Sequence, residues 1–306
     1  MSSDLKFKLH SQPVPDRHPP ELFSSLVQVD IHGLSHKGLV RPNNEDHFLV
    51  VRGGRALEAV MGNLSPNIVS RRFDELFFGM AVADGLGGEA SGEIASERAL
   101  EALLGMGLNT PDWMLRLGRP EINEVMWRMA DRFIRVHAAL IHDSAEDPSL
   151  QGMATTLTTA LTQGDDLIVT HIGDSRVYLF REGELQQLTH DHTLAQQLID
   201  GGGHAPNDTL VKELRNVLKQ ALGAKATECR PQVEHLKLKD GDSLLLCSDG
   251  LTDMVDDETI DQVLTHGSSA KAMTEELLDV ALKNGGRDNI TIIVSRYTFP
   301  RMSEKP

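Results

Sequence analysis

Acidic residues mark the ends of several apolar runs in this sequence, each beside glycine or asparagine. They are Glu45 and Asp46 in RPNNED, Asp84 in VADGLGG, Asp249 in CSDGLTD and Asp288 in GRDN. The run before Asp84, FFGMAVA, is wholly apolar, which is typical of a buried strand. Gly85 then allows the backbone to turn sharply and to approach a ligand closely. Asp84 is therefore expected at the rim of a sheet, where its carboxylate could do chemistry.

Carboxylates that converge on one rim repel one another, so they need a cation or raised pKa values to coexist. Oxygen ligands without cysteine or clustered histidine favour hard ions, Mg²⁺ or Mn²⁺, over Zn²⁺. For any one of these acids taken alone, a turn residue or a helix cap is the more common role. Acids at four strand ends together favour a metal site. Sequence spacing alone does not show whether these acids lie close together in the fold.

The elements that must position these acids come in runs of strands and runs of helices. Apolar or alternating segments predict strands over 27–31, 47–51, 77–84, 153–163, 165–173, 175–183, 232–239, 242–249 and 289–297. Helical spacing predicts helices over 89–106, 120–140, 194–199, 211–222, 257–266 and 269–284. Residues 33–46 are expected as a loop, and residues 153–183 as an antiparallel meander. Such runs favour an α+β fold with antiparallel sheets over a doubly wound parallel sheet.

The chain divides into one large domain and two tails. Residues 1–24 are rich in proline among polar residues, which predicts an extended or disordered N-terminal tail. A single domain is expected over 25–298, followed by a C-terminal tail over 299–306. Within the domain, residues 53–76 show no sustained period and are expected as an elaborated hairpin connection, and residues 190–226 are expected to be largely irregular.

Composition narrows the class of protein and its partners. The formal net charge of −15 argues against nucleic acid as a partner, because phosphate backbones are bound through clustered cations. Cys229 and Cys247 are too few for a disulfide framework or a zinc site, which indicates a reducing compartment. The sequence has no apolar run long enough for a membrane span or a signal peptide. We therefore expect no membrane partner and a cytoplasmic location.

Ordered motifs carry a resemblance to a known family. They are RPNNED (41–46), VADGLGG (82–88), GMATT (152–156), HIGDSR (171–176), CSDGLTD (247–253) and GRDN (286–289). As a set they resemble the bacterial branch of the protein phosphatase 2C family, the metal-dependent Ser/Thr protein phosphatases, over about residues 27–295. With the order of elements, this resemblance implies an α-β-β-α sandwich of two mainly antiparallel sheets flanked by helix pairs. It also implies that residues 190–226 form a flap beside the active site.

The resemblance further implies a centre of two Mn²⁺ or Mg²⁺ ions that hydrolyses phosphoserine and phosphothreonine. Asp84 would bridge both ions, the Gly85 carbonyl and Glu45 would complete one ion's protein ligands, and Asp249 and Asp288 would hold the other. Asp46 would hydrogen-bond water at the ions, and Arg41 would bind the substrate phosphate. The implied partners are phosphorylated proteins, among them a Ser/Thr kinase or its targets.

The sequence departs from the family pattern at two places. Leu86 stands where eukaryotic relatives carry a histidine proposed as a general acid, and His47 is a weak alternative donor because a histidine that opens a strand is usually structural. Gln151 stands where an acid often contributes to a third metal site, which puts a third ion in doubt. Asp174, between two expected strands, is interpreted as a turn residue, and the sequence His190-Asp191-His192 as a solvated loop.

Two other functions remain open on the sequence. One is a non-catalytic phosphatase-like module that regulates a partner by binding it, and the other is a hydrolase of small phosphate esters. The first would show no paired, acid-dependent Mn²⁺ sites in a metal titration. The second would prefer a small aryl phosphate over a phosphoprotein in direct competition.

Overall fold

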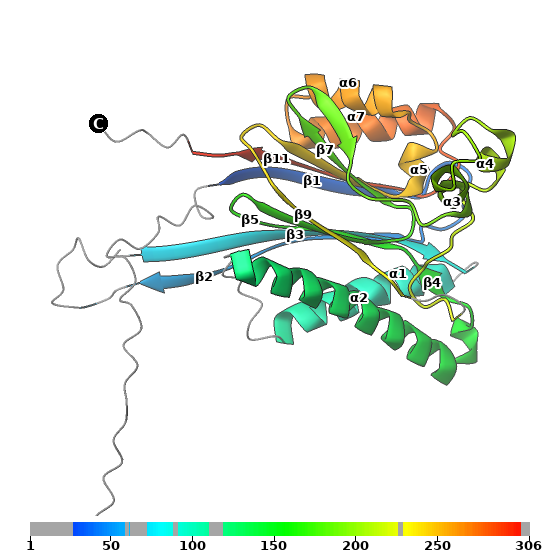
Figure 1. Cartoon of the computed structure of the whole chain (residues 1–306), viewed down its shortest axis with the longest axis horizontal. Coiled ribbons are helices and arrows are strands. Elements are labelled where there is room, and N and C mark those ends of the chain that lie inside the picture. The colour runs from blue at the N-terminus through cyan, green and yellow to red at the C-terminus, as the bar shows by residue number, and fades with distance from the viewer. Residues whose placement is uncertain are drawn as a thin grey trace, which may run out of the picture.

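The computed structural model describes residues 27–58, 61, 72–87, 91–109, 119–225 and 229–300. Two stacked sheets form its centre, and helices cover the outer face of each (Figure 1). Every strand pair in these ranges is antiparallel. The predicted α+β sandwich of two antiparallel sheets flanked by helix pairs is therefore confirmed.

The first sheet contains strands from both ends of the described chain, in the order β1-β11-β10-β7-β8. Their bounds are β1 Gln28–His36, β7 Arg176–Arg181, β8 Glu184–Gln187, β10 Ser243–Cys247 and β11 Ile290–Thr298. The apolar runs SLLLC and ITIIV place β10 and β11 at its centre, with all ten of these side chains buried. Because β10 and β11 are antiparallel, the end of β10 lies beside the start of β11, with Cys247 opposite Ile292. This pairing brings Asp249 and Asp288 to the same edge.

The second sheet has the order β2-β3-β5-β6-β9, and β4 pairs with the end of β3. Its strands are β2 Asp46–Glu58, β3 Arg72–Leu86, β4 Ala154–Thr155, β5 Leu157–Gln163, β6 Asp166–Ile172 and β9 Gln232–Lys237. The start of β2 lies beside the end of β3, with Asp46 directly opposite Asp84. Apolar side chains of the two sheets, such as Met80, Val82 and Leu246, pack against one another between the layers.

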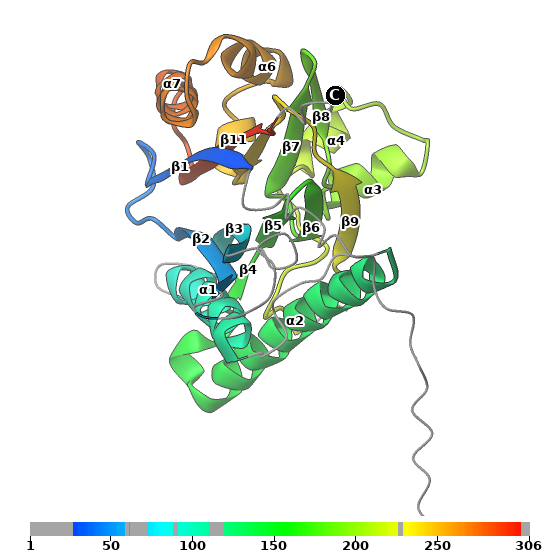
Figure 2. The ribbon, with the colours of Figure 1, turned by 90° about the vertical axis from the view of Figure 1, so that its left-hand side faces the viewer.

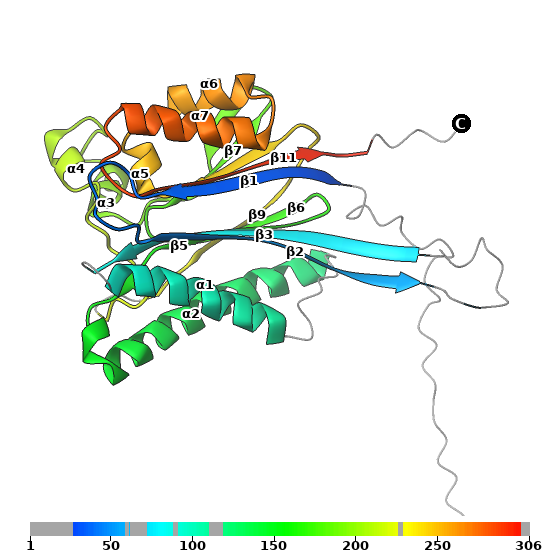
Figure 3. The same cartoon turned by 180° about the vertical axis from the view of Figure 1, so that it is seen from behind.

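Two helix pairs cover the outer faces. They are α1 Ser91–Asn109 with α2 Arg119–Glu146 on the second sheet, and α6 Asp257–His266 with α7 Ala270–Lys283 on the first (Figures 2 and 3). Side-chain caps start the second pair: Asp256 accepts from the Thr259 amide and Ser269 from the Ala272 amide. Short helices complete the described ranges: η2 Pro148–Leu150, α3 Leu194–Asp200, α4 Thr209–Glu213 and α5 Asp249–Thr252. No helix in those ranges has the length and apolar character needed to cross a bilayer.

Several expectations about local structure were wrong. The loop expected from residue 33 begins later, because β1 pairs with β11 as far as His36. The helix expected over 211–222 is only α4, and Leu222 instead pairs with Thr155. The hairpin predicted around 53–76 is present, but its strands are longer than expected, because 47–51 and 77–84 extend outward to Glu58 and Arg72. Residues 59, 60 and 62–71 of that region lie outside the described residues.

The antiparallel meander expected over 153–183 is wrong for its third strand. The strands β5 and β6 form a hairpin, but β7 belongs to the other sheet, where it pairs with β8 and β10. Gly173 and Asp174 therefore lie in a crossing between the sheets. Gly173 has a φ of +117°, and a Cβ there would come within 2.5 Å of Thr156, which explains why glycine is needed at this crossing.

The sequence His190-Asp191-His192 is not the solvated loop that was expected. Asp191 is buried, and both of its carboxylate oxygens accept hydrogen bonds from Arg176, at 2.6–3.1 Å. The ring of His192 stacks on the buried His171 with 4.9 Å between centroids. Burial with a matched guanidinium partner turns this stretch into a structural link from β7 to the segment before α3.

We predict that Asp191→Asn lowers the free energy of unfolding by about 3–5 kcal/mol, because it leaves the Arg176 guanidinium buried without its counter-charge. Urea unfolding at neutral pH measures the change. The matched control is Asp200→Asn, whose carboxylate is 49% exposed and pairs with His190 at the surface; it should cost less than about 1 kcal/mol. Equal losses in the two variants would contradict the structural role of the buried pair.

Candidate metal centre

The acids predicted from the sequence meet at one end of the sandwich, where the loops of both sheets come together. A pocket of about 440 Å³ opens there. Its lining includes six of the predicted site residues, namely Arg41, Glu45, Asp84, Gly85, Asp249 and Asp288. Asp46 lies behind this lining, 3% exposed. The two sheets therefore contribute to one polar site.

Asp84 is fixed by the threonines of the GMATT motif. The amide of Asp84 donates to Thr156 Oγ1 at 3.0 Å, and its carbonyl oxygen accepts from Thr155 Oγ1 at 2.8 Å and from the Thr156 amide at 2.9 Å. Thr156 Oγ1 is in turn 2.9 Å from Ser175 Oγ, at the crossing between the sheets. These bonds satisfy the backbone at the end of β3, so the Asp84 carboxylate is left to face the pocket.

Gly85 is required by close packing. A Cβ at this position would lie 2.2 Å from the carbonyl oxygen of Gly92 and 2.7 Å from that of Glu45. The Gly85 amide also donates to the Glu45 carbonyl oxygen at 3.2 Å. A side chain here would push the start of α1 away from the pocket, so the glycine holds Glu45 and α1 against the end of β3.

Asn289 holds the loop that carries Arg41 and Glu45. Its side-chain oxygen accepts from the Glu45 amide at 2.8 Å, and its Nδ2 donates to the carbonyl oxygens of Lys37 and Asn43 at 3.0 and 2.8 Å. Three bonds from one buried side chain span this loop. Asn289 was not among the residues predicted to form the site, although its place in GRDN beside a candidate ligand was a usable signal.

Arg41 reaches across the pocket to Asp288. Its Nη2 donates to Asp288 Oδ2 at 2.6 Å, and its side chain is 55% exposed. The Asp288 hydrogen bond, together with the negative charges of Glu45 and Asp249 nearby, raises the pKa of Arg41 above its usual value. This guanidinium is therefore a cation at the mouth of an acidic pocket.

Asp46 is a buried carboxylate with one oxygen satisfied. Its Oδ2 accepts from Ser248 Oγ at 2.7 Å, while its Oδ1 has no hydrogen-bond partner among the described residues. Burial is the main cause that raises the pKa of Asp46 to about 6, although its hydrogen bond from Ser248 lowers it. A buried carboxylate oxygen without a partner costs free energy, so Asp46 Oδ1 is suited to accept a hydrogen bond from a donor such as water.

The remaining acids raise one another's pKa values. Burial is the largest cause for both Asp84 and Asp249, and the neighbouring carboxylates add to it, so both pKa values lie well above the usual range. Asp174 also lines the pocket, with its pKa raised to about 7 by burial and then by Asp191. The interpretation of Asp174 as a turn residue thus missed its place beside Asp249.

The acids of the pocket do not yet form a tight ligand cluster. Within the described ranges, no three His, Cys, Asp or Glu side chains are close enough to form a ready metal-binding group. Mutual repulsion opposes such closeness.

The other candidate residues lie in different places. The His47 ring pairs with Ser96 Oγ of α1 at 2.9 Å, a structural contact. Asp147 caps η2 through the Ser149 amide, and neither it nor Gln151 lines the pocket. Leu86 does line it.

The donor set nevertheless fits hard divalent ions. Carboxylates and a backbone carbonyl supply only oxygen, which Mg²⁺ and Mn²⁺ prefer. Burial and the neighbouring carboxylates both disfavour the charged forms of Asp84 and Asp249, and the unsatisfied Asp46 oxygen lies just behind the pocket. A pair of cations would relieve both features.

Comparisons with known proteins show which family this chain resembles. The model of the family described as "Protein phosphatase 2C" matches residues 69–290. The chain is 36% identical over 264 residues to serine/threonine protein phosphatase PstP of Mycobacterium tuberculosis, covering 85% of this chain and 43% of that protein. It therefore spans less than half the length of that relative. It is 32% identical over 266 residues to protein phosphatase PhpP of Streptococcus pneumoniae, covering 86% and 96%.

Solved structures show the same fold. The catalytic domain of PstP, crystallised with two manganese ions, has a TM-score of 0.68 and 32% identity, covering 89% of this chain and 99% of that one. The two-sheet fold is thus that of the solved phosphatase domains. This chain belongs to the protein phosphatase 2C family of Ser/Thr protein phosphatases.

We predict that Asn289→Ala weakens Mn²⁺ binding by about 10–100-fold, because the loop bearing Glu45 loses its three anchoring hydrogen bonds. Calorimetric Mn²⁺ titration measures the affinity, and hydrogen exchange should speed up at the amides of residues 37–45. The control is Asn284→Ala, which removes one exposed bond to the Met254 carbonyl oxygen and should leave both readouts unchanged. Unaltered exchange in the 37–45 loop would contradict the anchoring role.

We also predict that the Asp46 and Asp174 carboxylates take stability from the metal-free chain as pH rises from about 5 to 8. Folding raises the pKa of Asp46 to about 6 and of Asp174 to about 7, so the stability present below the unfolded-state pKa is lost as pH passes through these folded values. The buried rings of His171 and His192, whose pKa values burial lowers, act in the opposite sense up to about pH 6.5, so the carboxylate effect is measured as the difference between the unaltered chain and the double variant Asp46→Asn, Asp174→Asn. In urea unfolding with chelator present, this difference should change by roughly 2–4 kcal/mol over the pH range. A difference that does not change with pH would contradict the carboxylate effect.

Proposed function

We propose that this chain hydrolyses phosphoserine and phosphothreonine in proteins with the help of two divalent metal ions, Mn²⁺ or Mg²⁺. The observation that carries the proposal is the single pocket in which the oxygen ligands Glu45, Asp84, Gly85, Asp249 and Asp288 meet Arg41. Such a pocket can attract a phosphate only when cations outweigh the carboxylates.

The ligands divide between the two ions according to the elements that carry them. Asp84, near the end of β3, would be a ligand of both ions. Glu45 and the Gly85 carbonyl, joined by a backbone hydrogen bond, would complete one ion, and Asp249 and Asp288 from the first sheet would hold the other. Two ions in such a site activate water, orient it and neutralise charge as the phosphate ester bond breaks.

Arg41 suits the role of the phosphate-binding residue. A planar guanidinium can donate two charge-assisted hydrogen bonds to phosphate oxygens. Arg41 already makes one such bond at the pocket, to Asp288, and its partly exposed side chain lies at the entrance. Binding of a phosphate would draw Arg41 towards the substrate and release Asp288 for its own role.

Asp46 is placed to orient a water molecule. Ser248 fixes one carboxylate oxygen, and the other, without a partner, can accept a hydrogen bond from the water that attacks phosphorus. The proton donor for the leaving group is not the residue after Gly85, because Leu86 has no proton to give. His47 does not supply it either, since its ring faces α1 and pairs with Ser96.

Two ions rather than three form the proposed centre. Asp147 and Gln151, the residues considered for a third ion, do not line the pocket, and Asp147 is engaged as a cap. The proposed substrates are phosphoproteins, among them a Ser/Thr kinase or its targets. We further propose a cytoplasmic location, supported by the free thiols of Cys229 and the buried Cys247.

Phosphate release from a phosphothreonine peptide should require Mn²⁺ or Mg²⁺ and should fall at least about a thousandfold in Asp84→Asn, because the bridging charge between the ions is lost. A colorimetric phosphate assay measures it, and calorimetry should show the paired Mn²⁺ sites only in the unaltered chain. Metal-independent turnover, or undiminished turnover in Asp84→Asn, would sink the assignment. Paired Mn²⁺ binding without turnover would favour the regulatory binding module instead.

Arg41→Ala should raise KM for the phosphopeptide by about tenfold or more, because a charge-assisted contact with phosphate is lost. Mn²⁺ affinity should not fall, since Asp288 loses a competing cation. The matched control is Lys37→Ala in the same loop, which removes an exposed charge outside the pocket lining and should leave KM within about twofold. A small aryl phosphate assayed alongside the peptide tests the small-ester alternative. Reduced Mn²⁺ binding with unchanged KM would contradict the phosphate role.

A further inference from the structure

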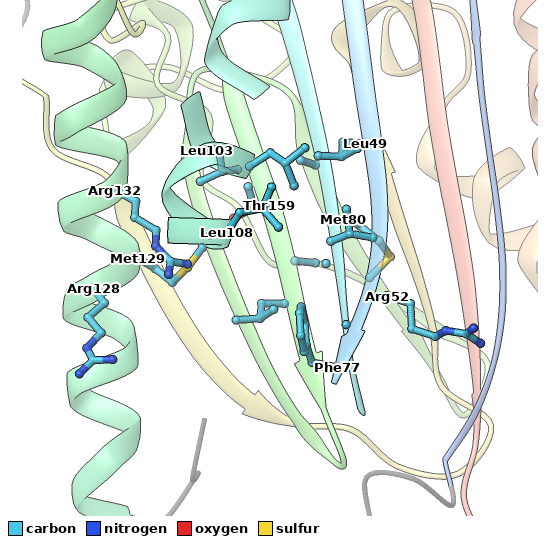
Figure 4. Close-up of a pocket in the computed structure, with 18 of the residues that line it drawn as sticks. Leu49, Arg52, Phe77, Met80, Leu103, Leu108, Arg128, Met129, Arg132 and Thr159 are labelled. Atoms are coloured by element: carbon cyan, nitrogen blue, oxygen red, sulfur yellow. The ribbon is translucent and has the colours of Figure 1, made fainter. Parts of the chain in front are cut away.

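A second pocket lies far from the acidic site, between the second sheet and its covering helices. It encloses about 280 Å³. Strands β2, β3 and β5 form its floor, and α1 and α2 form its walls (Figure 4). Apart from arginines and Thr159, its lining is apolar or glycine. The phosphatase chemistry proposed above makes no use of it.

Small residues on the sheet and on α1 account for the space. Gly79 and Ala81 of β3 line the floor with little or no side chain, and a Cβ at Gly79 would lie 2.9 Å from Val51 Cγ2. Gly107 lies in α1, and a Cβ built on it meets no atom within 4 Å. Glycine inside a helix costs roughly 1 kcal/mol relative to alanine, so nothing in the helix itself favours it there. Leu108, one residue further, remains 70% exposed at the edge of the pocket.

The cationic side of the pocket comes from α2. Arg128 is held by Glu124 at 2.6 Å, one helical turn earlier. Arg132 is partly buried at the wall, and its Nη1 donates only to Met129 Sδ, at 3.5 Å. No carboxylate among the described residues pairs with it. Burial, then the charge of Arg128, lowers the pKa of Arg132. The guanidinium of Arg52, from β2, points away from α2 (Figure 4).

We propose that this pocket binds a single-chain fatty acid, with its hydrocarbon chain among the apolar residues and its carboxylate on Arg132. A volume of about 280 Å³ suits one alkyl chain. One guanidinium without a counter-charge matches a monoanion, because Arg128 is already paired. In a chain of net charge −15, an uncompensated cation beside an apolar cavity is charge-complementary to such a ligand.

The test is calorimetric titration of the whole chain with hexanoate, octanoate, decanoate and dodecanoate, below their micelle concentrations. We expect saturable one-to-one binding whose affinity rises about threefold to fourfold for each added methylene until the pocket is full. Dodecanol, with the same chain and no charge, should bind about tenfold more weakly or worse than dodecanoate. Binding is read directly, so the result does not depend on phosphatase activity.

Variants locate the site. Gly107→Leu should abolish binding, because the leucine side chain would fill the open space beside this helical glycine. Arg132→Gln should weaken dodecanoate about tenfold and leave dodecanol unchanged. Arg135→Gln, three residues along α2 at an exposed ion pair with Asp131, is the matched control and should bind as the unaltered chain does. Thermal melting checks that each variant folds.

Photocrosslinking with a diazirine-bearing dodecanoate provides a readout that needs no variant. The labelled peptides should come from α1, α2 or β3. Labels elsewhere, no saturable binding, or equal binding of dodecanoate and dodecanol would overturn the proposal. So would a dimer in sedimentation that Gly107→Leu dissociates, because the occupant of the pocket would then be a second copy of the chain.

Discussion

Repulsion between carboxylates is the main physical constraint on this structure. Asp46 and Asp84 lie opposite each other on paired strands of one sheet, and Asp249 and Asp288 reach the same pocket from the other. Burial, and then the neighbouring carboxylates, raise the pKa values of Asp84 and Asp249, so their charged forms are unfavourable without positive charge. The fold holds these groups together at a cost in stability, and in the proposed centre divalent cations would offset that cost.

The groups that hold them in place are neutral side chains and backbone. Thr155 and Thr156 tie the backbone of Asp84, Ser248 orients Asp46, and Asn289 anchors the loop of Glu45. Each anchor sits next in sequence to a candidate ligand or in a strand paired with one. The same strand ends therefore position both the ligands and their anchors, which fixes the pocket relative to the two sheets.

Local patterns in the sequence were enough to find the individual acids and the α+β class. Asp84 and Asp249 each follow a buried strand, and a wholly apolar run with an acid at its end can be identified without a structure. Their convergence could not be read from spacing, because it depends on which strands share a sheet. The resemblance to protein phosphatase 2C supplied that information, and six of the residues that it named line one pocket.

What the sequence missed depends on long-range partners. Gly173-Asp174 has the composition of a hairpin turn, yet the chain crosses there to the other sheet, which carries Asp174 to the pocket. Asp191 is buried only because Arg176, on β7, faces it. The space beneath α1 arises from Gly79 and Gly107, which lie on separate elements. Such properties belong to pairs of distant residues, and local periodicity carries no information about them.

The central claim, that the carboxylates from the two sheets together hold two cations, is tested most directly by diffraction from crystals of this chain grown with Mn²⁺. Anomalous scattering at the manganese edge locates the ions without reference to activity. The account predicts two peaks in the pocket, one on each side of the Asp84 carboxylate, with Glu45 on one side and Asp249 and Asp288 on the other. A single peak away from Asp84, or no peak at saturating Mn²⁺, would contradict it.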